Sequence, residues 1–125
     1  MKNFLFLTSI LEGSTGIAIT VAPQILVPLL LSTSLEETGG IISARIAGIA
    51  ITVLAMNCWF SRNEKNIFAI MYSMAVYNFA IIAIFIYAGM VYQLASLLLW
   101  LVVVAHAGLG LWGIVLLRKN VIERQ

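Results

Sequence analysis

Residues 67–88, IFAIMYSMAVYNFAIIAIFIYA, form an apolar stretch that contains no charged side chain. A helix needs ~20 mainly apolar residues to cross the ~30 Å hydrocarbon core of a bilayer. Three other stretches have a similar character, at residues 4–31, 41–60 and 94–117. The sequence therefore predicts an all-α integral membrane protein, with four transmembrane helices in a single domain over residues 1–125.

The composition of the whole chain agrees with this prediction. Of its 125 residues, 62% are hydrophobic and only 10% are charged, whereas soluble domains average about 45–50% apolar and about 25% charged residues. One soluble core could not hide so much apolar surface, so we expect the lipid bilayer to be the main partner. The formal net charge of +2 is small and scattered, which argues against nucleic-acid binding.

The first apolar stretch resembles a signal peptide in its position near the N-terminus. Glu12, however, lies where the apolar region of a signal peptide would be. We therefore expect residues 4–31 to be retained as a membrane helix. Because proline lacks the backbone N–H of a helix hydrogen bond, this helix should tilt or bend near Pro23 and Pro28.

The connections between the four stretches are short, which predicts antiparallel neighbours and an up-down-up-down bundle. In such a bundle the first and third connections, residues 32–40 and 89–93, lie on the same side of the membrane. They contain Glu36 and Glu37 but no Lys or Arg. Cytoplasmic segments carry an excess of Lys and Arg, so we predict that both termini face the cytoplasm of a bacterial inner membrane. The basic residues that fall on this predicted cytoplasmic side are Lys2, Arg62, Lys65, Arg118, Lys119 and Arg124.

Polar side chains within the predicted spans are the main functional signal. A charge at the centre of a bilayer costs ~2.5–3.5 kcal/mol, so such residues usually face the interior of a bundle. With a rise of ~1.5 Å per residue, Glu12 and Thr52 lie ~12 Å from the cytoplasmic end, Asn78 ~16 Å and His106 ~17 Å. These depths predict a polar layer near the middle of the bilayer, formed by Glu12, Thr15, Thr52, Tyr77, Asn78 and His106.

Two interpretations of this polar layer remain open. In the first, its side chains form hydrogen bonds between helices, worth ~0.6 kcal/mol each on average, which fix the helix register. In the second, Glu12 and His106 form a buried site that carries protons or holds a polar ligand. A threonine or asparagine could fix the register more cheaply than the carboxylate of Glu12, whereas His106 fits a register role better.

Two other groups of residues have an expected place in the bundle. Arg45 lies about one turn below the outer end of its span, where its side chain can extend outward and pair with Glu36 or Glu37. Small residues in the second and fourth spans permit close contact between helices, either inside the bundle or between protomers. These helix-packing residues are Ala44, Gly48, Gly110 and Gly113.

The residues required by common catalytic and metal sites are missing. His106 is the only histidine and Cys58 the only cysteine, so the chain has no cluster suited to zinc. The Gly-x-Ser-x-Gly sequence of a nucleophile elbow does not occur. We therefore predict no metal, no cofactor and no catalytic residue, and the sequence favours a protein that is not an enzyme.

Several short motifs resemble those of the DoxX-like group of small four-helix bacterial membrane proteins and related families of unknown function. They are Pro23 with the leucine-rich stretch after it, the sequence ARIAG at residues 44–48, Trp59 before Arg62, the pair Tyr77 and Asn78, and His106. The resemblance implies a four-helix membrane fold. It transfers no catalytic residue to this chain.

Two functions follow from these patterns. In the first, the protein acts by association, as a homo-oligomer or as an accessory subunit of a membrane complex, because it has short connections and small-residue helix faces. In the alternative, it binds or transports a small molecule, a lipid or a proton through the polar site around Glu12 and His106.

Overall fold

The structure, a computed structural model, describes the backbone of residues 1–94 and 96–122 and the side chains of this part through Lys119. Within it the chain is all-helical, with five helices: α1 (Lys2–Val21), α2 (Pro23–Leu31), α3 (Thr38–Ser61), α4 (Phe68–Val91) and α5 (Leu97–Ile122). The helices α1, α3, α4 and α5 are long and apolar enough to cross a membrane. The predicted all-α fold with four helices long and apolar enough to span a membrane is therefore confirmed, and such helices are those expected of a membrane protein.

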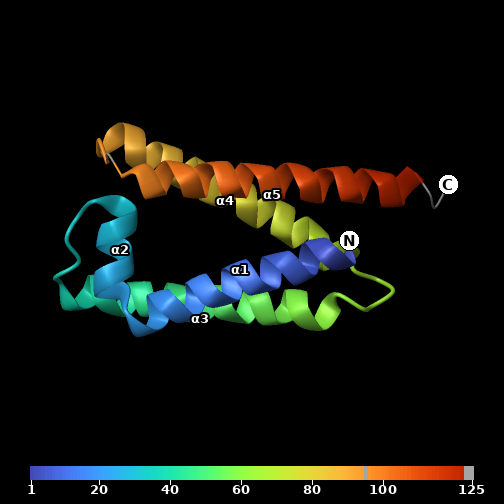
Figure 1. The fold of residues 1–125 in the computed structure, drawn as a ribbon, viewed down its shortest axis with the longest axis horizontal. Coiled ribbons are helices and arrows are strands. Elements are labelled where there is room, and N and C mark those ends of the chain that lie inside the picture. Colours follow the sequence, from blue (N-terminus) through green and yellow to red (C-terminus); the bar gives the residue numbers. More distant parts are fainter. Residues whose placement is uncertain (95, 123–125) are drawn as a thin grey trace.

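The first predicted span is divided at Ala22. This residue lies between α1 and α2 with φ −131° and ψ 56°, outside the helical region, and Pro23 opens α2. The residue before a proline is disfavoured in the helical conformation, because the proline ring clashes with its backbone. The expected bend near Pro23 is thus a complete break. The nine-residue helix α2 lies across the direction of α1, as Figure 1 shows.

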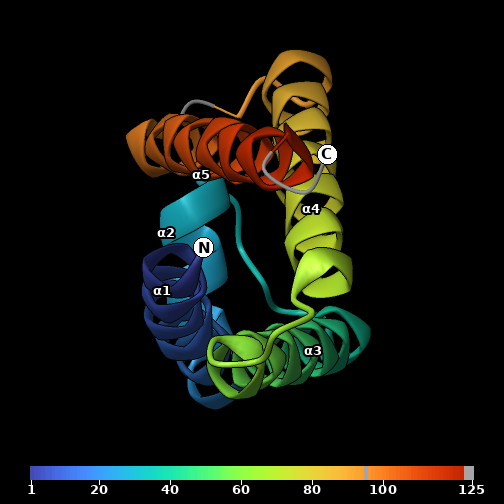
Figure 2. The same ribbon diagram turned by 90° about the vertical axis from the view of Figure 1, so that its right-hand side faces the viewer.

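The four long helices pack mainly as two pairs. Helix α1 packs along α3, and α4 packs along α5, whereas contacts between the two pairs are few. In Figure 1, α3 runs back beside α1 and α5 runs back beside α4. Figure 2 views the molecule along its length and shows α1 and α3 below α5, with α2 and α4 on either side between them. Helix α2 contacts α5 as well as α1 and α3, and so joins the two pairs.

The hydrophobic core lies toward the end of the molecule where α1 begins. Phe4, Met71, Met74 and Leu109 belong to one buried cluster, which also contains Cys58 of α3. The ring of Phe4 packs edge-on against Trp112 of α5, with ring centroids 5.3 Å apart. This cluster brings α1, α3, α4 and α5 together at one end, whereas the short α2 joins the pairs at the other.

The contact between α1 and α3 is unusually close and nearly symmetric. A Cβ atom added to Gly48 would lie 2.7 Å from the carbonyl oxygen of Gly16, and one added to Gly16 would lie 2.7 Å from that of Gly48. Four residues after each glycine, the hydroxyls of Thr20 and Thr52 donate to the carbonyl oxygens of Gly16 and Gly48, at 2.8 and 2.9 Å. The two backbones touch here because neither helix carries a side chain at the crossing point.

Candidate functional site

Three polar side chains from three helices meet beside the hydrophobic core. The hydroxyl of Tyr77 on α4 donates a hydrogen bond to Oε2 of Glu12 on α1, at 3.0 Å. The other carboxyl oxygen, Oε1, lies 3.8 Å from Nε2 of His106 on α5. Glu12 is only 5% exposed. Helix α1 is thus connected to both members of the second helix pair through a single buried carboxyl group.

The other ring nitrogen of the histidine anchors the ring to its own helix. Nδ1 of His106 lies 2.9 Å from the carbonyl oxygen of Val102, one turn earlier in α5. A carbonyl oxygen can only accept a hydrogen bond, so Nδ1 is the donor and carries a proton. This arrangement directs Nε2 toward Glu12. The rings of His106 and Tyr77 also lie side by side, with centroids 6.0 Å apart.

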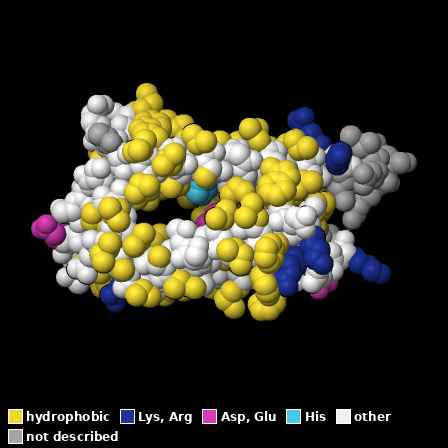
Figure 3. Space-filling model, in the orientation of Figure 1, with side chains coloured by type: hydrophobic (Ala, Val, Ile, Leu, Met, Phe, Trp, Pro, Cys, Tyr) yellow, Lys and Arg dark blue, Asp and Glu magenta, His cyan; other side chains and the backbone are white. Residues whose placement is uncertain are grey.

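These three side chains line a cavity of about 220 Å³ whose other walls are largely apolar. Helices α1, α2, α3, α4 and α5 all contribute to the wall. Figure 3 shows a slot between the two helix pairs, with the histidine and an acidic side chain at its edge. The apolar residues of the wall are Leu11, Ile19, Leu30, Ile51, Ile81, Phe85, Val102, Ala105 and Leu109.

A second apolar cavity, of about 250 Å³, adjoins the first and shares Thr15, Ile19, Leu30 and Val102 with it. Its remaining lining residues come from α2 and from the start of α5. Together the two cavities offer a polar end near Glu12 and an apolar end beside α2. This division suits a molecule with one polar group and a hydrocarbon portion.

The other members of the predicted polar layer lie in different places. Thr15 is exposed to the surroundings of the protein and lines the open cavity near Glu12. Thr52 lies in the close contact between α1 and α3. Asn78 is fully buried, with its amide nitrogen bonded to the carbonyl oxygen of Met74 at 2.7 Å. The structure thus brings Glu12, Thr15, Tyr77 and His106 to one cavity, while neither Thr52 nor Asn78 lines it.

The predicted outer charges do not form a pair in the described part of the chain. Arg45 lies on the exposed surface of α3, and the one contact at salt-bridge distance among the described residues joins Glu12 and His106. Glu36 and Glu37 line a shallow recess with Ser34, Leu35 and Gly40, and Arg45 is not part of it.

The small residues predicted to pack helices make their contacts inside the chain. Gly48 faces Gly16 and Thr20, Gly110 faces the ring of Phe79 and the Cβ atom of Asn78, and Gly113 faces the ring of Phe4. Ala44 is half-buried. By contrast, a Cβ atom added to Gly108 would meet nothing within 4 Å.

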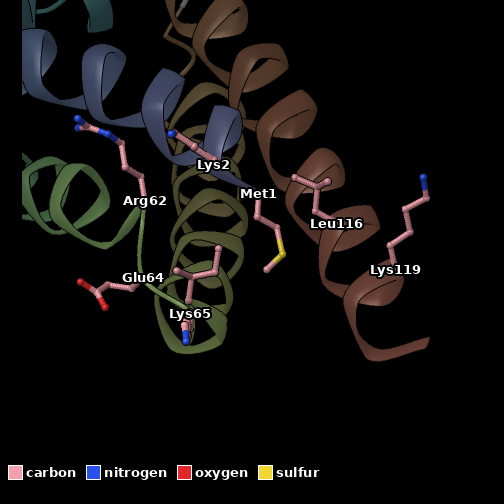
Figure 4. A pocket seen from close by; sticks show the side chains of 8 residues that line it. Met1, Lys2, Arg62, Glu64, Lys65, Leu116 and Lys119 are labelled. Atoms are coloured by element: carbon pink, nitrogen blue, oxygen red, sulfur yellow. The ribbon is translucent and has the colours of Figure 1, made fainter. Parts of the chain in front are cut away.

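A separate recess of about 410 Å³ lies at the end of the molecule where α1 begins. Figure 4 shows Met1 and Leu116 between Lys2 and Arg62 on one side and Lys119 on the other. Lys65 and Glu64 also line it. The cations surround an apolar floor and do not converge on one point, an arrangement suited to the phosphate groups of a membrane surface. Of the basic residues named from the sequence, Arg124 lies outside the described residues.

The apolar wall of the cavity could not be identified from the sequence. Leu30 and Phe85, for example, belong to helices that are apolar on every side, so no pattern separates cavity-facing from lipid-facing residues. The available signal is spacing: Leu11, Thr15 and Ile19 flank Glu12 at positions one, three and seven residues away, and thus lie on nearby turns of α1.

Within residues 1–94 and 96–122, no group of three or more His, Cys, Asp or Glu side chains could hold a metal ion. In comparisons with family models, curated proteins and solved structures, none matched the chain. The resemblance to the DoxX-like group therefore stays a prediction, and the function has to be argued from the site itself.

Proposed function

We propose that this protein binds a small, mainly apolar molecule inside the membrane, through a polar group that reaches Glu12, Tyr77 and His106. The supporting observation is that these three side chains, each from a different helix, line one cavity with apolar walls. Small-molecule sites usually combine such walls with a few convergent polar groups. A structural role alone would not require an open cavity beside the carboxyl group.

The alternative, action by association with other membrane subunits, has less support from the geometry. Gly48, Gly110 and Gly113 were the residues expected to admit a neighbouring helix, and each contacts another helix of the same chain. The exposed apolar side chains of α3, α4 and α5 need no protein partner, because lipid covers such surfaces. Association with other subunits stays a prediction, and none of the residues expected to mediate it identifies a binding surface.

Binding can be tested by filling the cavity. Ala105 lines it, so Ala105→Phe should place an aromatic ring in the space available to the ligand. With tritium-labelled 1-naphthylmethanol as the probe, a scintillation proximity assay on the immobilised protein in mild detergent should show saturable binding. We expect Ala105→Phe to weaken this binding at least about tenfold, or ~1.4 kcal/mol.

The matched control is Ala83→Phe, which adds the same ring to an exposed position on α4 that lines none of the cavities described above. It should bind the probe like the unmodified protein. Equal binding by the Ala105→Phe and Ala83→Phe variants would show that the probe does not occupy this cavity, and the proposed function would be rejected.

We also propose that the four long helices cross the membrane in alternating directions, with both termini on the cytoplasmic side. The clustering of Lys2, Arg62, Lys65 and Lys119 around one recess supports this orientation, since cytoplasmic segments are rich in Lys and Arg. In a Cys58→Ala background, a membrane-impermeant maleimide added to intact cells should label Ser34→Cys and spare Glu64→Cys. The reverse pattern would invert the proposed orientation.

A further inference from the structure

Two atoms of the side chains that line the cavity face each other without a direct hydrogen bond. Tyr77 donates to Oε2 of Glu12, and Nδ1 of His106 donates to the carbonyl oxygen of Val102. These contacts leave Oε1 of Glu12 and Nε2 of His106, which are 3.8 Å apart. That separation exceeds a hydrogen-bond length. In a carboxylate and a neutral imidazole both atoms are acceptors, so a ligand that joins them must present donors.

The charges around these two atoms limit how many protons they hold. A carboxylate beside a neutral imidazole has one net negative charge, and a carboxylic acid beside an imidazolium has one net positive charge. Either net charge is costly in the interior of a membrane. One proton makes the pair neutral, and the two side chains share it in the sense that either Glu12 or His106 can hold it.

The other titratable groups near the pair cannot supply a compensating positive charge. They are Tyr77 on α4, which bonds to Glu12, and Cys58 on α3, which is buried in the adjoining core cluster. A phenol and a thiol are neutral or negative. Helix α2 contains no titratable residue, and Arg45 lies on the exposed surface of α3. The positive charge that can replace the shared proton therefore has to come from a ligand.

We propose that the cavity binds a hydrophobic primary amine, as its ammonium ion, in exchange for the proton shared by Glu12 and His106. This inference rests on the proposed function and names its ligand class. One ammonium N–H donates to Oε1 of Glu12 and a second donates to Nε2 of His106. The displaced proton leaves to water. The site then contains a carboxylate, a neutral imidazole and one ammonium ion, so its net charge stays at zero.

The dimensions of the site agree with this ligand. A nitrogen ~2.8–3.0 Å from each of two acceptors is compatible with their separation of 3.8 Å. The rings of Tyr77 and Phe85 line the same cavity and offer the electron-rich faces that stabilise cations. The adjoining cavity beside α2 takes the hydrocarbon portion. A quaternary ammonium ion has no N–H donor, and an alcohol has one donor and no charge, so both fit less well.

The inference can be tested with three probes that share the naphthylmethyl group: 1-naphthylmethylamine, 1-naphthylmethanol and the N,N,N-trimethyl derivative of the amine. Isothermal titration calorimetry of the full chain in detergent, repeated in buffers with different ionisation enthalpies, measures the protons released on binding. We expect the amine to release about one proton per molecule bound, and the alcohol to release none. The trimethyl derivative should bind at least about tenfold more weakly than the amine.

Glu12→Gln should abolish proton release and reduce amine binding at least about tenfold, while 1-naphthylmethanol still binds and so shows that the cavity is intact. His106→Leu removes one acceptor and should reduce the preference for amine over alcohol at least about fivefold. Ser14→Ala is the control on the same helix, because the Ser14 hydroxyl is exposed and bonds to the carbonyl oxygen of Leu11. It should bind all three probes like the unmodified protein.

The outcomes separate this inference from the proposed function. If the amine binds no more tightly than the alcohol, or releases no proton, the exchange is wrong, although the cavity still binds apolar molecules. The same conclusion follows if the preference for the amine is unchanged in both Glu12→Gln and His106→Leu. If Ala105→Phe weakens the binding of neither the amine nor the alcohol, the cavity does not bind these molecules and the proposed function fails as well.

Discussion

Helix α1 makes two very different contacts with the rest of the chain. Against α3, Gly16 and Gly48 allow the two backbones to touch, and the nearby threonine hydroxyls bond within their own helices. Against α4 and α5, Glu12 reaches out to Tyr77 and His106 and leaves a cavity of about 220 Å³. Small residues close one contact, whereas long polar side chains hold the other open. The difference suggests that the first contact supports the fold and the second is available to a ligand.

The largest effect on stability is expected from a substitution that prevents the close contact between α1 and α3. A Cβ atom on Gly48 would lie 2.7 Å from both the Gly16 carbonyl oxygen and the Thr20 backbone nitrogen, and backbone atoms cannot move aside cheaply. Gly48→Val should therefore lower the free energy of unfolding by ~3 kcal/mol or more, at the upper end of overpacking effects. Circular dichroism during titration with a denaturing detergent measures this quantity.

The control for this change is Gly108→Val on α5, where an added Cβ would meet nothing within 4 Å. Valine is also a better helix former than glycine, by a few tenths of a kcal/mol. We expect this variant to unfold at the same detergent fraction as the unmodified protein or slightly above it. Equal destabilisation at Gly48 and Gly108 would mean that the α1 and α3 backbones do not touch at this point.

An intermediate effect is expected at the second contact. Tyr77→Phe removes the hydroxyl that donates to Glu12 and keeps the aromatic ring. Measured hydrogen bonds between membrane helices average ~0.6 kcal/mol and reach ~1.7 kcal/mol. We expect the free energy of unfolding to fall by an amount in the upper half of this range, because the acceptor is a buried carboxyl group. The same unfolding titration measures it.

Tyr72→Phe provides the matched control on α4. Tyr72 is 58% exposed, and its hydroxyl makes no hydrogen bond within the part of the chain that the structure describes. The change should leave the unfolding titration within experimental error. If Tyr72→Phe reduced stability as much as Tyr77→Phe, the effect would come from removing a tyrosine hydroxyl anywhere on α4 and not from the bond with Glu12.

The smallest effect on stability is expected from replacing either threonine of the α1–α3 contact by serine. Thr52→Ser keeps the hydroxyl that bonds to the Gly48 carbonyl oxygen and removes one half-buried methyl group, which should reduce stability by about 0.5 kcal/mol or less. Because the contact is nearly symmetric, Thr20→Ser should have the same effect within ~0.3 kcal/mol. Clearly unequal values would show that the two sides of the contact differ in energy.

The four long helices could be predicted because each contains a long apolar stretch, and the bend near Pro23 because proline disrupts a helix. The height of each polar residue could be estimated as well, since the rise per residue is constant. Height places Glu12, Thr52 and Asn78 close to one level, but it does not say which way a side chain points. Lipid is as apolar as the core, so periodicity does not reveal the buried face. The sequence therefore could not show that Thr52 and Asn78 lie in helix contacts away from the cavity.

The extent of α2 could not be read from the sequence either. Residues 4–31 form one mainly apolar stretch, and although Pro23 predicts a bend, nothing in the stretch shows that the part after Ala22 turns across the bundle. The position of Leu30 in the cavity wall follows from that turn. The pairing of α1 with α3 is likewise invisible, because the glycines that permit it occur among other small residues in both helices.

The pairing of α1 with α3 also sets the order in which the protein can assemble. A ribosome adds ~5–20 residues per second, so α1 is made seconds before α3, the helix against which it packs most closely. The α1–α3 contact can form once α3 has been made, but the carboxyl group of Glu12 has to wait for Tyr77 and then for His106, which both follow α3 in the chain. During biogenesis, therefore, one helix takes part in two steps: α1 can first pair with α3, and its carboxyl group gains both partners only after α4 and most of α5 have followed.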